Sequence, residues 1–244
     1  MADASGPDPS AAASEPERLT DAQRSLRAQM LATEHWSLLA SRSTTQSEVL
    51  TRIAIFLTLV SAGLLSLGLL GNATEFRGWF GVAALGVLFV LVLIGVVTAM
   101  RVFNTATEDM AYVLAMNRLR GAYVDLDPGI ERYFLMSAAD DEAGIERTYF
   151  PFATRRGTQV IASSMMVILV VETALIGLFV GSSTYAIIGA VGWSVGIGAV
   201  VAIASALLWL RSGYLGYRSV LRSHHVLRRT STPWPPDEVE EPGG

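Results

Sequence analysis

Four long apolar runs, grouped in two pairs, constrain the fold of this chain more than any other feature of its sequence. The runs cover about residues 53–70, 79–100, 160–180 and 186–210. A helix needs about 20 apolar residues to cross the hydrocarbon core of a bilayer, and each run is close to that length. Only 16% of the 244 residues are charged, against about a quarter in soluble domains. We therefore expect an all-α integral membrane protein, a four-helix bundle of two helical hairpins.

Arginines beside these runs predict the topology. Four spans place both termini on one side, and the arginines that flank this side are Arg52, Arg101, Arg155, Arg156 and Arg211. Arg77 is the only basic residue in the two turns on the opposite side. By the positive-inside rule, both termini and the central segment are expected to be cytoplasmic. The chain has no lysine and is rich in Ala, Gly, Val and Leu, which is typical of GC-rich bacterial genomes, so we expect a bacterial inner membrane.

The polar sequence between and around the runs divides the chain further. Both tails are poor in residues that can form a core, and we expect them to be disordered. The expected organisation is an N-terminal tail (1–17), a cytoplasmic helix (18–45), the first transmembrane hairpin (46–102), a small cytoplasmic helical layer (103–157), the second hairpin (158–211), a basic juxtamembrane helix (212–230) and an acidic tail (231–244).

Local signals predict several helix boundaries. Residues 45–48 and 105–108 each have the Thr-x-x-Glu spacing of a capping box, so each predicts the start of a new helix. Gly121 predicts the end of the helix that begins at the second box. Pro128 predicts a short second helix, and the acidic residues 137–144 predict a loop.

Glu172 is a charged residue near the middle of the third apolar run. An ionised carboxylate inside a membrane is costly, so we expect it to be protonated and hydrogen-bonded, or to face water. One hypothesis is a proton or cation site in a pathway. The alternative is a protonated side chain that bonds to Ser61, Ser66 or Thr98 and serves helix packing.

Small residues predict close packing in the second hairpin, whose turn is expected at residues 181–185. The fourth run carries Gly189, Gly192, Gly196 and Ala199 at helical spacing. Such ridges allow helix backbones to approach closely. The ridge predicts either packing within the bundle or a homo-oligomer interface through Gly189, Gly192 and Gly196.

Two sets of arginines are candidate contact residues. The set after the fourth run predicts contacts with lipid headgroups of the bilayer, or serves only topology: Arg211, Arg218 and Arg222. The set in the central segment lies far from the spans and is expected to contact a cytoplasmic protein partner: Arg118, Arg120 and Arg132.

The sequence lacks the common motifs of catalysis. It contains no cysteine, no P-loop, no nucleophile elbow and no HExxH zinc motif. His224 and His225 are adjacent, so on a helix they point about 100° apart and are poorly placed to share a metal. We expect no catalytic residue, no metal and no cofactor, and the acidic tail argues against nucleic acid as a partner.

Several short stretches together resemble a family of multi-pass membrane proteins from actinobacteria that has no assigned activity. The resemblance covers about residues 30–150, and the stretches that carry it are Glu34-His35-Trp36-Ser37-Leu38-Leu39, Asn117-Arg118-Leu119-Arg120, Tyr123, Pro128, Tyr133-Phe134 and Asp140-Asp141. It implies no particular site, but it directs attention to the cytoplasmic face.

Two function hypotheses follow from these features. The first is a non-enzymatic membrane scaffold or regulatory subunit that presents the cytoplasmic helices to partners. The alternative is an oligomeric channel or proton-coupled transporter that uses Glu172, because four spans are few to enclose a pathway. An enzyme that acts on lipid is a third possibility without a supporting motif.

Overall fold

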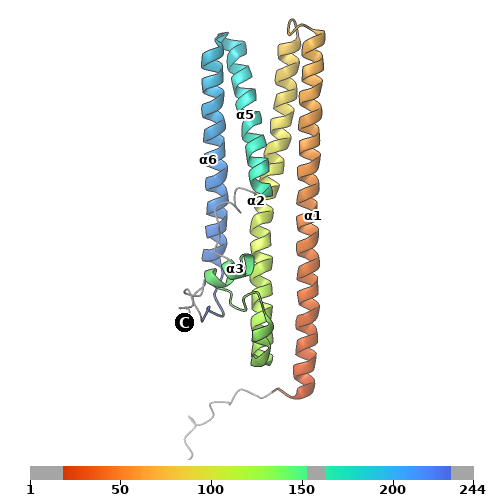
Figure 1. Ribbon diagram of the computed structural model, residues 1–244, viewed down its shortest axis with the longest axis vertical. Helices are drawn as coiled ribbons and strands as arrows, with labels where there is room; N and C mark the ends of the chain where they lie inside the picture. Colours follow the sequence, from red (N-terminus) through yellow and green to blue (C-terminus); the bar gives the residue numbers. More distant parts are fainter. Residues whose placement is uncertain (1–18, 153–162, 232–244) are drawn as a thin grey trace, which may run out of the picture.

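A computed structural model of the protein describes residues 19–152 and 163–231 (Figure 1). The predictions for residues 1–17 and for nearly all of the acidic tail lie outside these ranges. In chain order the described elements are α1 (Asp21–Ala73), α2 (Phe80–Leu126), the 3-10 helix η2 (Pro128–Tyr133), α3 (Glu142–Tyr149), α5 (Ser164–Ile188) and α6 (Val191–Ser223).

The described chain is all-α, and four of its helices are long and apolar enough to cross a membrane. These helices are α1, α2, α5 and α6, joined as two hairpins by short turns. Large apolar side chains cover their outer surfaces, among them Leu65, Val195 and Val200 at 65–66% exposure. A lipid environment accommodates such a surface, whereas water does not. The expected all-α membrane four-helix bundle is confirmed.

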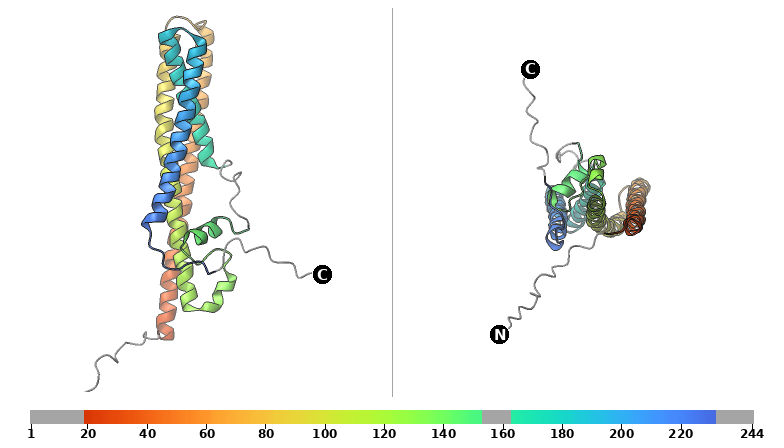
Figure 2. Two further views of the ribbon diagram at one scale, coloured as in Figure 1. Left: turned by 90° about the vertical axis from the view of Figure 1, so that its left-hand side faces the viewer. Right: turned by 90° about the horizontal axis from the view of Figure 1, so that it is seen from below.

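The four long helices stand side by side in a row. Contacts run from α1 to α2, from α2 to α5 and from α5 to α6, and the view from below shows α1 and α6 at the two outer positions (Figure 2). The core between α1, α2 and α5 contains Val49, Ile53, Phe56, Val60, Leu88, Leu91, Ala99, Val102, Ile168 and Leu175. The C-terminal half of α6 also contacts α2, where Trp209 stacks on Phe103 with ring centroids 5.2 Å apart.

The first two helices continue without a break through both predicted capping boxes. α1 passes through Thr45 and α2 passes through Thr105, so both predicted helix starts are wrong. The glutamates of the two boxes bind an arginine instead of a helix N-terminus. Arg101 donates hydrogen bonds to Glu48 of α1 (3.1 Å) and to Glu108 of α2 (2.7 Å).

Gly121 does not end a helix, because α2 continues to Leu126. A Cβ atom on Gly121 would lie 3.0 Å from the carbonyl oxygen of Ala138, so glycine here allows a close approach of the chain. The short helix at Pro128 is confirmed as η2, with the Asp127 side chain accepting a hydrogen bond from the Gly129 amide (2.9 Å).

The predicted loop at residues 137–144 is shorter than expected. Asp141 accepts a hydrogen bond from the Gly144 amide (2.9 Å), and this cap begins α3 at Glu142. An acidic residue at a helix N-terminus favours this arrangement because it satisfies an unpaired amide and complements the helix dipole.

The second hairpin turns later than predicted. α5 continues through residues 181–185 to Ile188, and its C-cap is Gly189 in the left-handed conformation, with φ 73°. Only Gly189 and Ala190 separate α5 from α6, so Gly189 belongs to the turn and not to a ridge on the fourth span. α6 ends at Ser223, short of the predicted end near Arg229.

Other glycines carry the close contact between α5 and α6. A Cβ atom on Gly198 would lie 2.6 Å from the Gly177 carbonyl oxygen, and one on Gly181 would lie 3.1 Å from the Ser194 carbonyl oxygen. Cβ atoms on Gly192 and Gly196 would meet nothing within 4 Å. The prediction that Gly192 and Gly196 pack within the bundle is therefore wrong, because both lie on the exposed side of α6.

Substituting alanine for Gly198 should destabilise the second hairpin by about 1–2 kcal/mol, because the added methyl group meets backbone that cannot rotate away. Gly196→Ala is the matched control, since its methyl group enters open space. Thermal unfolding in detergent measures both variants. An unchanged melting temperature for Gly198→Ala would contradict the close contact.

Candidate functional site

Glu172 lies in α5 with its carboxyl group pressed against α2. The side chain is completely buried at 0% exposure. A Cβ atom on Gly95 would lie 1.5 Å from Glu172 Oε2 and 2.9 Å from the Cζ atom of Phe56. The carboxyl group therefore occupies a notch that exists because residue 95 has no side chain, with Phe56 of α1 beside it.

Both oxygens of this carboxyl group are buried and have no hydrogen-bond partner. The partners proposed from the sequence are engaged elsewhere: the hydroxyls of Ser61, Ser66 and Thr98 donate to the carbonyls four residues earlier in their own helices. The specific packing role predicted from the sequence, a hydrogen bond to one of these hydroxyls, is therefore absent. A buried polar group without a partner is costly, so it calls for another explanation.

Glu172 sits off-centre in the bundle. It is eight residues from the start of α5 and sixteen from the end, which places it about 12 Å and about 24 Å from the two ends of the helix. Its neighbour Gly95 is six residues from Arg101. Glu172 therefore lies nearer the polar end of α5 than its opposite end, and its position near the middle of a membrane span stays a prediction.

The described residues outside the spans at this end form the polar layer, which comprises residues 21–52, 101–152 and 211–231. Asn117 of α2 is its best-connected buried side chain, at 0% exposure. Its amide nitrogen donates to the carbonyls of Ala139 (2.9 Å) and Gly144 (3.2 Å), and its oxygen accepts from Thr148 Oγ1 (2.9 Å). This one side chain therefore holds α3 and the preceding loop against α2.

Asp140 holds the C-terminal segment, defined as residues 224–230, in the polar layer. Its buried carboxylate accepts hydrogen bonds from the backbone amides of Leu227 (2.9 Å) and Arg228 (2.7 Å) and from Arg118 Nε (2.8 Å). Its own amide donates to the Arg228 carbonyl (3.0 Å), and Nε2 of His224 lies 2.8 Å from its carbonyl oxygen. The segment is thus fixed to a loop more than 80 residues earlier in the chain.

The three arginines predicted to contact a partner lie in different environments. Arg118 binds Asp140 and donates to the His225 carbonyl, and Arg120 donates to the Asn117 side-chain oxygen (2.8 Å). These two therefore take part in the internal network. Arg132 is exposed and stacks over the Tyr133 ring, so it is the member of the set most accessible to a partner.

A second cluster around Asp109 joins α1, α2 and α3. The carboxylate accepts hydrogen bonds from Arg42 (2.6 and 3.0 Å), from Gln46 (2.9 Å) and from the Tyr149 hydroxyl (2.7 Å). Burial raises the pKa of Asp109, but the bonds from Arg42 and Tyr149 lower it by more, so its pKa lies below the ordinary value. Burial together with Asp109 raises the pKa of Tyr149.

Acidification should open the polar layer. The pKa of Asp140 is also lowered, because its hydrogen bonds to Arg228, Leu227 and Arg118 outweigh the effect of burial, and that of Asp141 is lowered by its bonds to Thr230. A carboxyl group whose pKa is lower in the folded state stabilises the fold at pH values above its unfolded pKa, about 3.9. This contribution is lost as the pH falls through the folded pKa.

Melting temperatures measured in detergent should therefore fall steeply below about pH 4. Burial, assisted by Arg120, lowers the pKa of His35, so a shallow decline should already begin below about pH 6.5. An Asp140→Asn variant should show a smaller loss between pH 5 and pH 3 than the wild type. A melting temperature that stays constant down to pH 3 would refute this account.

Arg211, Arg218 and Arg222 share one face of α6, because residues seven and eleven positions apart lie on the same side of a helix. All three are exposed, and Arg218 also lies over the Tyr214 ring, 5.7 Å from its centroid. The face extends about 16 Å along the helix, with Arg211 closest to the membrane span. Contact with lipid headgroups stays a prediction for this face.

Sequence reasoning missed two features of these sites. Gly95, which accommodates Glu172, and the C-terminal segment, which binds Asp140, carry no local signal of their roles. Within residues 19–152 and 163–231, no three His, Asp or Glu side chains gather in a way that could hold a metal ion.

The fold and these sites define a class, that of all-α multi-pass membrane proteins with a polar helical layer on one side. No protein-family model matches this chain, and no curated protein or solved structure is significantly similar to it.

Proposed function

We propose that the protein is a non-enzymatic scaffold or regulatory subunit of a bacterial inner membrane, with both termini and the polar layer in the cytoplasm. The arginines that flank the spans on the side of the polar layer support this orientation. The partner in this proposal is a cytoplasmic protein that docks on the polar layer.

The observation that carries the proposal is the unbroken extension of α1 and α2 beyond their apolar spans. Residues 21–52 of α1 extend about 48 Å past its span, and residues 101–126 of α2 extend about 39 Å. The Asp109 cluster and the Asp140 contacts brace these extensions. A short linker would suffice to connect two hairpins, so helices of this length are better explained as a platform.

Exposed apolar side chains on the extension of α1 offer a surface for the partner. Trp36 and Met30 are 73% and 65% exposed, although this part of α1 lies outside the apolar span. Large aromatic side chains and methionine are enriched at protein interfaces. The single row of membrane helices further favours a scaffold, because one copy of such a row encloses no pathway by itself.

Photo-crosslinking in the native cells tests the scaffold proposal. A photoreactive amino acid placed at Met30 or Trp36 should give a discrete adduct with a cytoplasmic protein. The same probe at Leu65, which is equally exposed but lies in the membrane span, is the matched control and should give none. Absence of protein adducts from both polar positions, with the protein correctly inserted, would contradict the proposal.

Glu172 favours a second candidate function, an oligomeric channel or proton-coupled transporter. Its buried and unpartnered carboxyl group is the specific observation behind this candidate. The exposed ridge of Gly192 and Gly196 provides a surface through which copies could associate.

Flux measurements test the transport candidate. Proton flux into liposomes that contain the protein should exceed that into empty liposomes, and Glu172→Gln should abolish it. Glu75→Gln, at an exposed turn on the opposite side, is the control. Absence of flux would remove the transport candidate, and flux that survives Glu172→Gln would remove Glu172 as its site.

A further inference from the structure

The polar end of α6 carries exposed arginines whose charge no described acidic residue balances. α6 contains no Asp or Glu, and within residues 19–152 and 163–231 neither Arg211 nor Arg218 forms an ion pair with a carboxylate. The arginines at the ends of the first two spans differ, because Arg52 and Arg101 both bind Glu48. Among the described arginines beside the spans, the uncompensated positive charge is therefore on α6.

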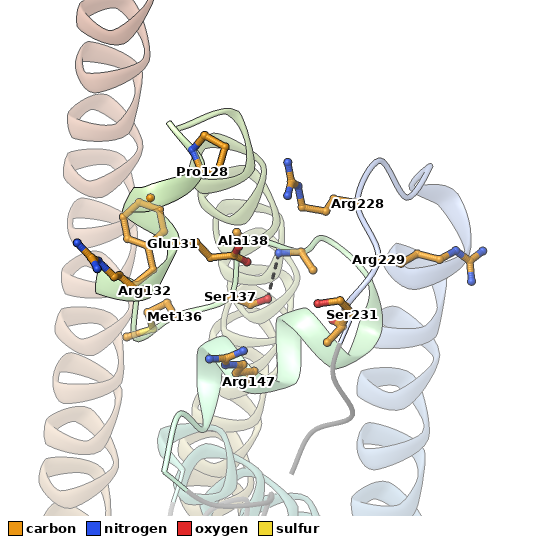
Figure 3. Close-up of a pocket in the computed structure, with 14 residues that line it drawn as sticks. Pro128, Glu131, Arg132, Met136, Ser137, Ala138, Arg147, Arg228, Arg229 and Ser231 are labelled. Carbon is orange, nitrogen blue, oxygen red and sulfur yellow. Dashed lines mark hydrogen bonds between the residues drawn. The ribbon is translucent and has the colours of Figure 1, made fainter. Parts of the chain in front are cut away.

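A cleft of about 660 Å³ in the polar layer is also lined by arginines, but these do not converge on one point. Figure 3 shows the guanidinium groups of Arg132 and Arg229 directed outward and away from each other. Arg228, which also lines the cleft, is paired with Asp125. The arginines of α6, in contrast, share one exposed helix face, so this face is the better candidate for binding an anionic group.

Arg211 marks the level at which α6 leaves the hydrocarbon core. Residues 191–210 are uncharged, and twenty helical residues span about 30 Å, which is the thickness of the core. The headgroup layer extends about 5–8 Å further. Tyr214 is 58% exposed and lies about 4.5 Å beyond Arg211 along the helix, so it belongs to this layer, where tyrosine is enriched.

Side chains on this part of α6 point back toward the membrane. The Cα–Cβ bonds of a helix tilt toward its N-terminus, and α6 begins at the turn on the opposite side of the bundle (Figure 1). Arg218 lies about 10 Å beyond Arg211, but its guanidinium carbon is 5.7 Å from the centroid of the Tyr214 ring, one turn nearer the membrane. Arg218 therefore reaches the headgroup layer, whereas Arg222, about 16 Å beyond Arg211, lies outside it.

The same face continues into the span as an apolar surface. Leu207 and Leu208 lie four and three residues before Arg211, so they neighbour it on the helix, and they are 62% and 65% exposed. α6 also has an outer position in the row of long helices (Figure 2). A molecule with an anionic head and apolar chains therefore matches both parts of this face.

We propose that this face of α6 binds an anionic phospholipid of the leaflet next to the polar layer. Arg211 and Arg218 donate charged hydrogen bonds to the phosphate, and the acyl chains lie along Leu207 and Leu208. Arg222 takes no part, although it shares the face. The proposal is independent of whether the protein serves as a scaffold or a transporter.

Native mass spectrometry of the purified full-length protein in detergent, titrated with short-chain phosphatidylglycerol, tests this proposal. This lipid should bind saturably and more tightly than zwitterionic phosphatidylcholine of the same chain length. Arg218→Gln should weaken its binding about fivefold, and Arg211→Gln/Arg218→Gln about 25-fold, since each arginine near an anionic surface contributes about a factor of five. Arg218 lies outside the span, so its single variant tests the site independently of any effect of Arg211 on membrane insertion.

Arg222→Gln is the matched control, because it removes an equally exposed arginine from the same face and should leave the affinity unchanged. Glycerol 1-phosphate carries the phosphate without acyl chains and distinguishes a lipid from a phosphate ligand in solution. Equal binding of the two lipids, full binding by Arg218→Gln, an equal loss with Arg222→Gln, or binding of glycerol 1-phosphate as tight as that of phosphatidylglycerol would each overturn the proposal.

Discussion

Replacing Asp140 with asparagine should lower the free energy of opening of the C-terminal segment by about 3 kcal/mol. The wild-type carboxylate is buried and accepts from two backbone amides and from Arg118. An asparagine of the same shape presents an NH2 group to these donors, so at least one amide loses its acceptor and Arg118 loses its counter-charge. Breaking a buried ion pair from one side costs more than the pair itself contributes, because the remaining charge is left uncompensated.

Hydrogen exchange of the amides in residues 224–230 measures this loss directly. A loss of about 3 kcal/mol corresponds to an acceleration of roughly a hundredfold. Asp125→Asn is the matched control, since Asp125 also pairs with the C-terminal segment through Arg228 but is 67% exposed. Exposed ion pairs contribute about 0–1 kcal/mol, so this control should change exchange less than tenfold. Equal effects of the two variants would show that burial of Asp140 is not what fixes the segment.

The membrane part of the fold was predictable because lipid imposes a simple rule. Residues in the hydrocarbon core must form helices of about 20 apolar residues, and composition alone then locates each span. The hairpin pairing follows from the short connections, such as residues 74–79. The turn of the second hairpin was misplaced because Gly181, Ser182 and Ser183 are typical of turns in water, whereas inside the bundle they continue the helix α5.

Helix boundaries in the polar layer were harder to predict, because capping signals depend on what surrounds them. Thr44 lies just before one predicted helix start, yet its hydroxyl donates to the carbonyl of Ala40 (3.0 Å) and the helix continues. Glu48 and Glu108 have capping-box spacing, but Arg101 binds Glu48 across the helices and Glu108 within α2. A local pattern cannot reveal a partner that comes from 53 residues away.

The candidate sites also combine features that the local sequence reveals with contacts between residues far apart in the chain. An acid in an apolar run is visible in any single sequence, so Glu172 could be identified at once. The notch at Gly95 could not be identified, because the residues around Gly95 have the composition of an ordinary membrane span. Arg118 and Arg120 were identified as unusual for their distance from the spans, but their roles depend on Asn117 and Asp140, which only folding brings beside them.

Replacing Glu172 with methionine should raise the free energy of unfolding by about 3 kcal/mol. Methionine has nearly the shape of the glutamate side chain and can occupy the notch at Gly95 without a new clash. It removes two buried oxygens that have no hydrogen-bond partner in the described structure. Such oxygens lose their hydrogen bonds to water when they are buried, and neither the protein nor the surrounding lipid provides new ones.

The sign of this change separates the two roles considered for Glu172. A residue kept for packing should be at its optimum, so any substitution would destabilise the bundle. A residue kept for proton or ion binding can be held at a cost in stability, as at many functional sites. Denaturation in detergent at pH 7 measures the change, with Glu172→Gln as a polar control that should gain little. A methionine variant that unfolds more readily than the wild type would assign Glu172 to helix packing and leave the transport candidate without its residue.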